Sequence, residues 1–313
     1  MDKELARFKS EINLTEYAAG KGYQLDRKES SGNSIVMREP VSNDKVIMSK
    51  GGQGHWTYFS VRDRSDNGSI IDFVQKRSGV TLGGVRLELR PWLAGEIDRP
   101  SPEQYRQDVK VVGKDRQKVR TAFDRTRIIT DSRYLNSRGI TRETIASERF
   151  RGMVRMDERQ NLVFPHYDRQ GLAGFEVKNS GFTGFVKHGE KRAWQSNFMP
   201  GDKRLVLTES AIDAMSYHQL KGDPHTRYMS TGGQFSEAQR ELVKEAMQSL
   251  PKGGQVVLAF DNDAPGHRYA QEFSKLAPRY VRVLRSVPVI GKDWNEQLMG
   301  LLKKRGLSKG MSR

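Results

Sequence analysis

Acidic residues follow three short apolar runs in the last third of the chain, and carboxylates are side chains that can hold a metal ion. Each lies after one run: Glu209 after residues 204–208, Asp261 and Asp263 after residues 255–260, and Asp293 after residues 280–284. Because these runs alternate with helical patterns, they predict a parallel sheet with crossover helices. The carboxyl ends of parallel strands meet at one edge, where open α/β folds place their sites. We therefore expect the carboxylates to converge there.

The donor set favours Mg²⁺ or Mn²⁺ as the cofactor, because hard cations prefer oxygen ligands. The chain contains no cysteine, which excludes disulfides and thiolate zinc sites. Two such ions can activate a hydroxyl and stabilise the leaving oxygen in a phosphoryl transfer. A lone Asp-x-Asp such as Asp261-Asn-Asp263 is more often a solvated turn or a helix cap. The metal interpretation therefore depends on the position of this pair directly after a strand.

The charge balance is strongly basic, with 54 Lys and Arg against 38 Asp and Glu and a formal net charge of +16. Such a surface attracts phosphate backbones through counterion release and long-range steering. A soluble basic protein without a specific partner is the alternative on charge alone. No run approaches the ~18 apolar residues of a membrane span, and the N-terminus lacks the apolar core of a secretory signal. We expect a cytoplasmic protein with no membrane partner.

The patterns predict an α/β chain in four parts. Residues 1–95 form a small α+β domain, with helical residues 2–19, strands at 34–38, 45–48 and 55–61, and a helix over 69–79. Residues 96–125 are polar and basic, which predicts a linker. Residues 126–202 combine two short helices with a strand–turn–strand, and residues 203–313 carry the strand–helix alternation.

Three motifs of the last part resemble a Toprim domain, the Mg²⁺-binding fold shared by bacterial DnaG-type primases, topoisomerases and some nucleases. They are Leu207-Thr-Glu209-Ser-Ala-Ile-Asp213-Ala, Asp261-Asn-Asp263-Ala-Pro-Gly266 and Gly291-Lys-Asp293-Trp-Asn-Glu296. The third motif and the earlier stretch Leu162-Val-Phe-Pro165 are most similar to the primase versions. Ser210 stands where cellular primases usually have Gly, which resembles the plasmid, phage and mobile-element branch.

The resemblance implies a Toprim domain with a mostly parallel sheet flanked by helices, preceded by a mixed α+β primase-core subdomain and a ribbon-like domain. It implies Glu209, Asp261 and Asp263 as the catalytic acidic residues. Glu209 would bind metal or handle the proton of the attacking hydroxyl, and the Asp pair would hold Mg²⁺. Asp293 would support a second metal or order the site. Asp213, one helical turn after Glu209, would cap or orient rather than bind metal.

The resemblance also implies a basic wall that holds the template and the incoming nucleotide. The candidates for this wall and for phosphate contact near the acidic residues are Arg138, Lys178, Lys187, Lys191, Arg192 and Arg268. Arginine suits bidentate phosphate contact better than lysine does, so Arg138 and Arg192 are the preferred pair. For each of these residues alone, a solvated surface charge is the alternative.

The first part resembles the small zinc ribbon that begins DnaG-type primases, and the stretch from Gly68 to Gly79 is most similar to its closing helix. The four metal ligands are missing, so we expect no zinc. The packing of a few apolar side chains would then hold the domain: Trp56, Phe59, Ile71, Phe73 and Val74. The domain would be either a metal-free template reader or a structural remnant.

These resemblances predict a DNA primase, a nucleotidyltransferase that makes short RNA primers on single-stranded DNA from ribonucleoside triphosphates. It would act in replication or transfer of a plasmid, phage or integrative element, with a replicative helicase or a relaxase as partner. The sequence stops soon after the third motif, so we expect no helicase-interaction domain of the cellular type. A Toprim nuclease and a non-catalytic nucleic-acid-binding accessory protein are the alternatives.

Overall fold

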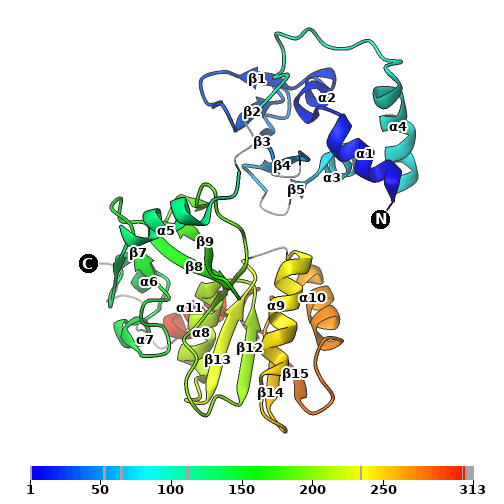
Figure 1. Cartoon of the computed structure of the whole chain (residues 1–313). Helices are drawn as coiled ribbons and strands as arrows, with labels where there is room; N and C mark the ends of the chain where they lie inside the picture. Colours follow the sequence, from blue (N-terminus) through cyan, green and yellow to red (C-terminus); the bar gives the residue numbers. More distant parts are fainter. Residues whose placement is uncertain are drawn as a thin grey trace. The chain divides into compact units, whose positions relative to one another are not determined.

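The computed structural model describes residues 2–51, 54–63, 66–109, 113–232, 235–304 and 306. The chain divides into two compact units, Met1–Lys114 and Asp115–Arg313 (Figure 1). Among the described residues, no helix has the length and the apolar character needed to cross a membrane.

The first unit is an antiparallel sheet packed on helices. Its five strands follow one another in chain order: β1 (Gln24–Asp26), β2 (Ile35–Arg38), β3 (Lys45–Lys50), β4 (Trp56–Ser60) and β5 (Asn67–Gly68). Its helices are α1 (Lys3–Glu11), α2 (Leu14–Gly20), α3 (Ile70–Ser78) and α4 (Leu82–Ala94). The three predicted strands and the helix predicted over 69–79 are therefore present as β2, β3, β4 and α3.

The alternation along β4 decides which side chains of the first unit form its core. Trp56 and Tyr58 are buried, whereas Phe59 is 49% exposed. The prediction that Phe59 packs in the core is wrong, because successive side chains of a strand point to opposite faces and the Trp56 face is the inner one. The other predicted core residues, Trp56, Ile71, Phe73 and Val74, are buried.

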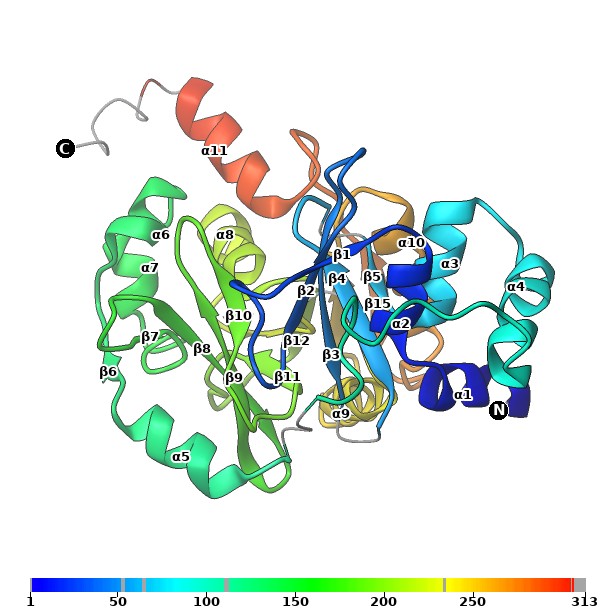
Figure 2. The same cartoon turned by 90° about the horizontal axis from the view of Figure 1, so that it is seen from above.

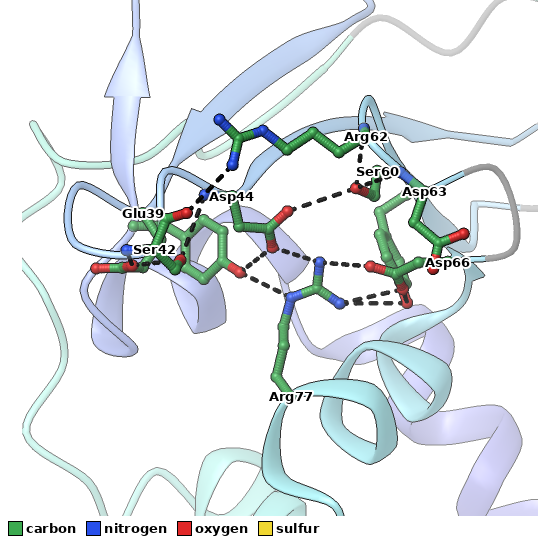
Figure 3. A network of polar contacts seen from close by, with 10 residues as sticks. Glu39, Ser42, Asp44, Ser60, Arg62, Asp63, Asp66 and Arg77 are labelled. Carbon is green, nitrogen blue, oxygen red and sulfur yellow. Dashed lines mark hydrogen bonds and ion pairs between the residues drawn. The ribbon is translucent and has the colours of Figure 1, made fainter.

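The turns after β2 and β4 each have the two-residue spacing of a zinc knuckle, but with oxygen-bearing residues, Glu39-x-x-Ser42 and Ser60-x-x-Asp63 (Figure 3). The Glu39 carboxylate accepts hydrogen bonds from the amides two and three residues further on, at 3.1 and 2.5 Å. The Ser60 hydroxyl accepts the equivalent pair, at 3.3 and 3.4 Å. Each turn is thus closed around one oxygen acceptor.

A guanidinium joins these two turns. Arg77, on α3, forms ion pairs with Asp44 at 2.7 Å and with Asp66 at 3.0 Å, one beside each turn (Figure 3). The hydroxyls of Tyr23 and Tyr58 donate to the same two carboxylates at 2.5 Å each. The guanidinium carbon also lies 4.0 Å from the centre of the Phe73 ring. The Arg77 guanidinium therefore connects the two hairpin ends of the sheet.

The stretch 96–125, predicted as a linker, is divided between the units. Val109 is buried in the core of the first unit, and residues 110–112 lie outside the described residues. Helix α5 (Arg116–Asp124) belongs to the second unit, where Val119 and Phe123 pack against β8 and β9. The structure differs from the prediction here because two apolar residues spaced i, i+4 are enough for one helical face.

The second unit is built on one ten-stranded sheet. Its main path runs in the order β10-β9-β8-β11-β13-β12-β14-β15, with β6 and β7 beside β8. The strands are β6 (Arg127–Ile128), β7 (Arg155–Met156), β8 (Leu162–Asp168), β9 (Gly171–Lys178), β10 (Thr183–Phe185), β11 (Ala193–Gln195), β12 (Arg204–Thr208), β13 (Thr226–Ser230), β14 (Gln255–Leu258) and β15 (Arg282–Arg285). The pairs among β13, β12, β14 and β15 are parallel, and the earlier strands pair antiparallel.

Helices cover both faces of the parallel half (Figures 1 and 2). They and the two short preceding helices are α6 (Arg133–Ser137), α7 (Arg142–Ala146), α8 (Ala211–Lys221), α9 (Glu237–Gln248), α10 (Ala264–Ser274) and α11 (Trp294–Lys304). Val206 and Val257 pack with α8 and α11, whereas Leu205 and Leu258 pack with α9 and α10. The predicted α/β fold with a parallel sheet flanked by helices is confirmed for this half.

Candidate metal centre

The carboxyl edge of the parallel strands brings acidic residues together. Glu209 follows β12 and Asp261 comes shortly after β14, and the two strands are neighbours with Leu207 opposite Leu258. Asp263 begins α10, where its Oδ1 accepts from the Gly266 amide at 2.8 Å. Glu209, Asp261 and Asp263 therefore lie at one edge.

Asp293 reaches the same edge from the start of α11. Its Oδ1 accepts from the Glu296 amide at 2.7 Å. Its charge raises the pKa of both Asp213 and Asp261. Asp293 thus lies within electrostatic reach of the acidic edge and also caps the helix that follows it.

The backbone of the turn at Asp261 is held on two sides. A Cβ added at Gly266 would lie 2.2 Å from the Asp261 carbonyl oxygen, so only glycine allows α10 to approach this closely. The Arg285 guanidinium donates to the carbonyls of Phe260 at 2.7 Å and Asp261 at 2.8 Å. A rigid turn therefore presents the Asp261 side chain.

Two buried carboxylate oxygens at this edge have no hydrogen-bond partner among the described residues, Glu209 Oε1 and Asp261 Oδ1. Asp261 is 7% exposed. Burial, followed by the charges of Asp213 and Glu209, raises the pKa of Asp261 to about 8. Burial, followed by the charge of Asp263, raises the pKa of Glu209 to about 7. An uncompensated pair of carboxylates is costly, and a bound cation would relieve it.

Lys292 is the nearest cation to this pair that the structure describes. Its Nζ lies 3.0 Å from Asp263 Oδ2 and 3.8 Å from Asp261 Oδ2. Burial acts to raise the pKa of Asp263, but hydrogen bonds from the Gly266 amide and from Lys292 outweigh it, so this pKa is lowered. The hydrogen bond to Asp263 raises the pKa of Lys292 in turn. Asp263 is therefore ionised at neutral pH.

Asp213 ties two helices together. Its buried carboxylate accepts from the Asn295 amide at 3.2 Å and from the Ser210 hydroxyl at 2.5 Å. Burial and then the charge of Asp293 raise its pKa. Asp213 thus connects the start of α8 to the start of α11, which is consistent with the orienting role we expected, and that role stays a prediction.

The donor set fits Mg²⁺ or Mn²⁺, but it does not form a closed cage. Among the described residues, no three His, Asp or Glu side chains converge closely enough to form a preformed metal site. Mg²⁺ usually keeps several waters and needs only one or two carboxylates together with substrate phosphates. The unpartnered oxygens of Glu209 and Asp261, with Asp263 beside them, meet that requirement.

Two of the predicted basic residues lie near the acidic edge. Lys178 pairs with Glu176 at 3.1 Å, and its charge offsets a small part of the rise that burial causes in the pKa of Asp213. The Lys191 ammonium donates to the carbonyl of Gly232, whose amide in turn donates to the Glu209 carbonyl at 2.9 Å. Both lysines are thus connected to the residues around the site.

Arg192, one of the two preferred arginines, is held in a network of ion pairs. Arg192 pairs with Glu190 and, at 3.2 Å, with Asp168, which Arg116 also holds at 2.5 Å. The Arg116 hydrogen bond lowers the pKa of Asp168 to about 2, against its burial. Arg192 is therefore engaged in a structural network, and phosphate contact would require breaking it.

The remaining basic candidates have weaker links to the site. Arg138 ends α6; its carbonyl accepts from Asn295 at 2.8 Å, and its buried Nε has no partner among the described residues. Lys187, in the turn after β10, and Arg268, on α10, are exposed. Neither forms an ion pair within the part of the chain that the structure describes.

Sequence reasoning missed Lys292 and Arg285. Lys292 stands directly before Asp293 in a motif that drew attention only to its carboxylate. Arg285 ends β15, and nothing in a strand of alternating Arg and apolar residues distinguishes it from a surface arginine. Its role follows only from the pairing of β15 with β14, which brings the guanidinium to the carbonyls before Asp261.

Comparisons with known proteins agree with this architecture. Residues 206–298 match the family described as Toprim-like, and residues 133–202 match "Protein of unknown function (DUF3991)". The chain thus contains a Toprim domain. It is related to Toprim proteins of the phage and mobile-element primase type.

Two curated relatives show the extent of the similarity. The "65 kDa protein" of Zymomonas mobilis is 27% identical over 340 residues, covering 97% of this chain and 53% of its own length. The "DNA helicase/primase" of Enterobacteria phage T3 is 26% identical over 170 residues, covering 53% of this chain and 29% of its own. The chain therefore spans about half of the first relative and less than a third of the second.

Two solved structures are similar to part of the chain. The primase fragment of the bacteriophage T7 primase-helicase protein is 21% identical, with a TM-score of 0.43, over 60% of this chain and 74% of that one. The RNA polymerase domain of Mycobacterium tuberculosis primase DnaG is 17% identical, with a TM-score of 0.32, over 51% and 58%.

Proposed function

We propose that the protein is a DNA primase that makes short RNA primers on single-stranded DNA from ribonucleoside triphosphates. The observation that carries this proposal is the pair of unpartnered, buried carboxylate oxygens of Glu209 and Asp261 at the carboxyl edge of the parallel strands. Lys178 and Lys191 lie nearby. The net charge of +16 favours a polyanionic template. We place this activity in the cytoplasm, in the replication or transfer of a plasmid, phage or integrative element.

In this proposal, Glu209, Asp261 and Asp263 hold Mg²⁺ or Mn²⁺, which neutralises phosphate charge and makes a hydroxyl more acidic. The 3′-hydroxyl oxygen of one nucleotide attacks the α-phosphate of the next, and pyrophosphate leaves. Glu209 would be either a ligand of the ion or the group that takes the hydroxyl proton. The lysines hold the phosphates, so catalysis is mainly positioning and charge neutralisation.

The partners extend the proposal beyond the catalytic site. The name of the phage relative, DNA helicase/primase, supports a replicative helicase as partner, and a relaxase is the alternative. The first unit would contact the template. In support, Phe59 is half exposed on the outer face of the sheet, where a base could stack on its ring.

A priming assay tests this function. The chain is incubated with single-stranded DNA of varied sequence, labelled ribonucleotides and Mg²⁺ or Mn²⁺. We expect labelled primers from the wild type and a loss of at least about a hundredfold in Glu209→Gln, which keeps the shape but removes the charge. Glu237→Gln, on the exposed side of α9, is the matched control and should prime normally.

The products separate the alternatives. Shortened DNA in the absence of nucleotides would favour a Toprim nuclease, because the same carboxylates can activate water. Unchanged biological activity in the Asp261→Ala, Asp263→Ala double variant would favour a non-catalytic accessory protein. Either result would overturn the primase proposal.

A further inference from the structure

The loop that carries Lys292 is fixed through its backbone. The Lys292 carbonyl accepts from the Asn262 amide at 2.8 Å, and the Lys292 amide donates to Glu296 Oε2 at 2.6 Å. Gly291 before it has a φ of +76°, and a Cβ there would lie 2.5 Å from the Glu296 side chain. The backbone of Lys292 is therefore bonded on one side to the acidic turn, residues 261–263, and on the other side to α11.

The side chain of Lys292, in contrast, is 57% exposed, and its only ion pairs among the described residues are those with Asp261 and Asp263. A lysine has a flexible four-carbon stem and a compact charge. The ammonium can therefore leave the two carboxylates by side-chain rotation alone, without any change in the loop.

The ammonium occupies the one Asp263 oxygen that is free for a metal, because Asp263 Oδ1 already accepts from the Gly266 amide. It contacts Oδ2 of both aspartates, while Asp261 Oδ1 and Glu209 Oε1 remain without a partner. A divalent ion binding Asp263 would compete with the ammonium for Oδ2, and it would also reach the oxygens that the ammonium leaves without a partner.

We propose that Lys292 is an internal counter-cation: it holds the Asp261–Asp263 pair in the metal-free protein, gives way when a divalent ion binds, and then binds a phosphate of the nucleotide. This inference rests on the proposed metal-dependent function. The displaced ammonium remains tethered beside the ion on the exposed side, where the phosphates of a metal-bound triphosphate arrive. Lys292 would thus be a substrate-binding residue in the loaded enzyme.

The proposal predicts opposite changes in two affinities. In Lys292→Met the competing charge is gone, so Mn²⁺ should bind roughly two- to fivefold more tightly, the size expected for a partly exposed ion pair. In saturating Mn²⁺, ATP should bind about tenfold more weakly, because a charge-assisted contact to phosphate is lost. A residue with only a structural role would not move the two affinities in opposite directions.

The experiment uses the full chain. Mn²⁺ binding is measured by electron paramagnetic resonance and ATP binding by calorimetry at saturating Mn²⁺, for the wild type, Lys292→Met and Lys292→Gln. The matched control is Lys303→Met, an exposed lysine in the last turn of α11, which should change neither affinity. Lys292→Gln also removes the charge, so it allows the same two affinities to be measured if the Met variant folds poorly.

Each outcome either supports or overturns the proposal. Tighter Mn²⁺ binding together with weaker ATP binding supports the proposal. Unchanged or weaker Mn²⁺ binding in both variants overturns it, as does unchanged ATP affinity. If the wild type itself binds no Mn²⁺, the metal centre of the proposed function fails as well; if it binds Mn²⁺ and the variants behave as it does, only the role of Lys292 fails.

Discussion

Asp261 and Glu209 differ from ordinary surface carboxyls because burial comes first among the causes that raise their pKa, to about 8 and about 7. In the metal-free protein both are therefore largely protonated at pH 6 and ionise as the pH rises through 7 to 8. A raised carboxyl pKa stabilises the fold below the unfolded pKa of about 4, and this contribution is lost progressively as the pH rises from there through the folded pKa.

We expect the melting temperature of the chelated protein to fall between pH 6 and pH 9, and Asp261→Asn to show a smaller fall. Mn²⁺ affinity should move the other way, rising by about tenfold per pH unit below pH 7 for each proton that the ion displaces. Thermal melts in chelator and Mn²⁺ titrations across this range check both. A wild-type slope that Asp261→Asn leaves unaltered would contradict the assignment.

Gly266 gives a second prediction at this scale. Gly266→Ala would push a methyl group against the Asp261 carbonyl, only 2.2 Å away, so the acidic turn must shift. We expect Mn²⁺ affinity to fall by at least about tenfold, since such a displacement would move Asp261, a ligand in the proposed metal centre. Gly83→Ala, early in α4 with its nearest contact at 3.6 Å, is the control and should bind Mn²⁺ normally.

At the scale of elements, the strands of the parallel half and the helices between them were predictable because their apolar periods are regular, but the closing helix α11 was not predicted. Helix α4 and strand β11 were missed: α4 begins with Leu-Gly-Gly and contains Pro91, and β11 has three residues. The engagement of Arg192 was also unpredictable, since its partner Asp168 lies 24 positions away and meets it only through the pairing of β8 with β11. The residues next to Arg192 in the sequence do not indicate an ion pair that forms only when two strands come together.

A buried ion pair joins elements of the second unit. Arg149 and Asp202, 4% and 1% exposed at their side chains, form two hydrogen bonds at 2.6 and 2.8 Å. Arg149→Met would leave the buried Asp202 carboxylate without its cation, with the Met199 amide still donating to it at 2.9 Å, and we expect a loss of about 3–5 kcal/mol in the free energy of unfolding. Adding Asp202→Leu should recover part of it. Urea denaturation checks this, and a double variant no more stable than the single one would contradict it.

The whole molecule consists of two units whose stability depends on different interactions. In the first unit, Arg77 joins the two turns, so Arg77→Met should destabilise that unit by about 2 kcal/mol or more, less than a fully buried pair because the network is partly exposed. Amide hydrogen exchange should accelerate over β2, β3 and β4 and stay unchanged over β12 and β14. Faster exchange in both units would show that they unfold together.

The oxygen-closed turns and the guanidinium that connects them have a practical consequence. The first unit contains no cysteine, and the Arg77 guanidinium joins its two turns, so we expect its fold to withstand a chelator. If the proposed metal centre is correct, stripping divalent ions should act on the carboxyl edge of the second unit. Chelation would then be a reversible way to silence that site while the first unit stays folded.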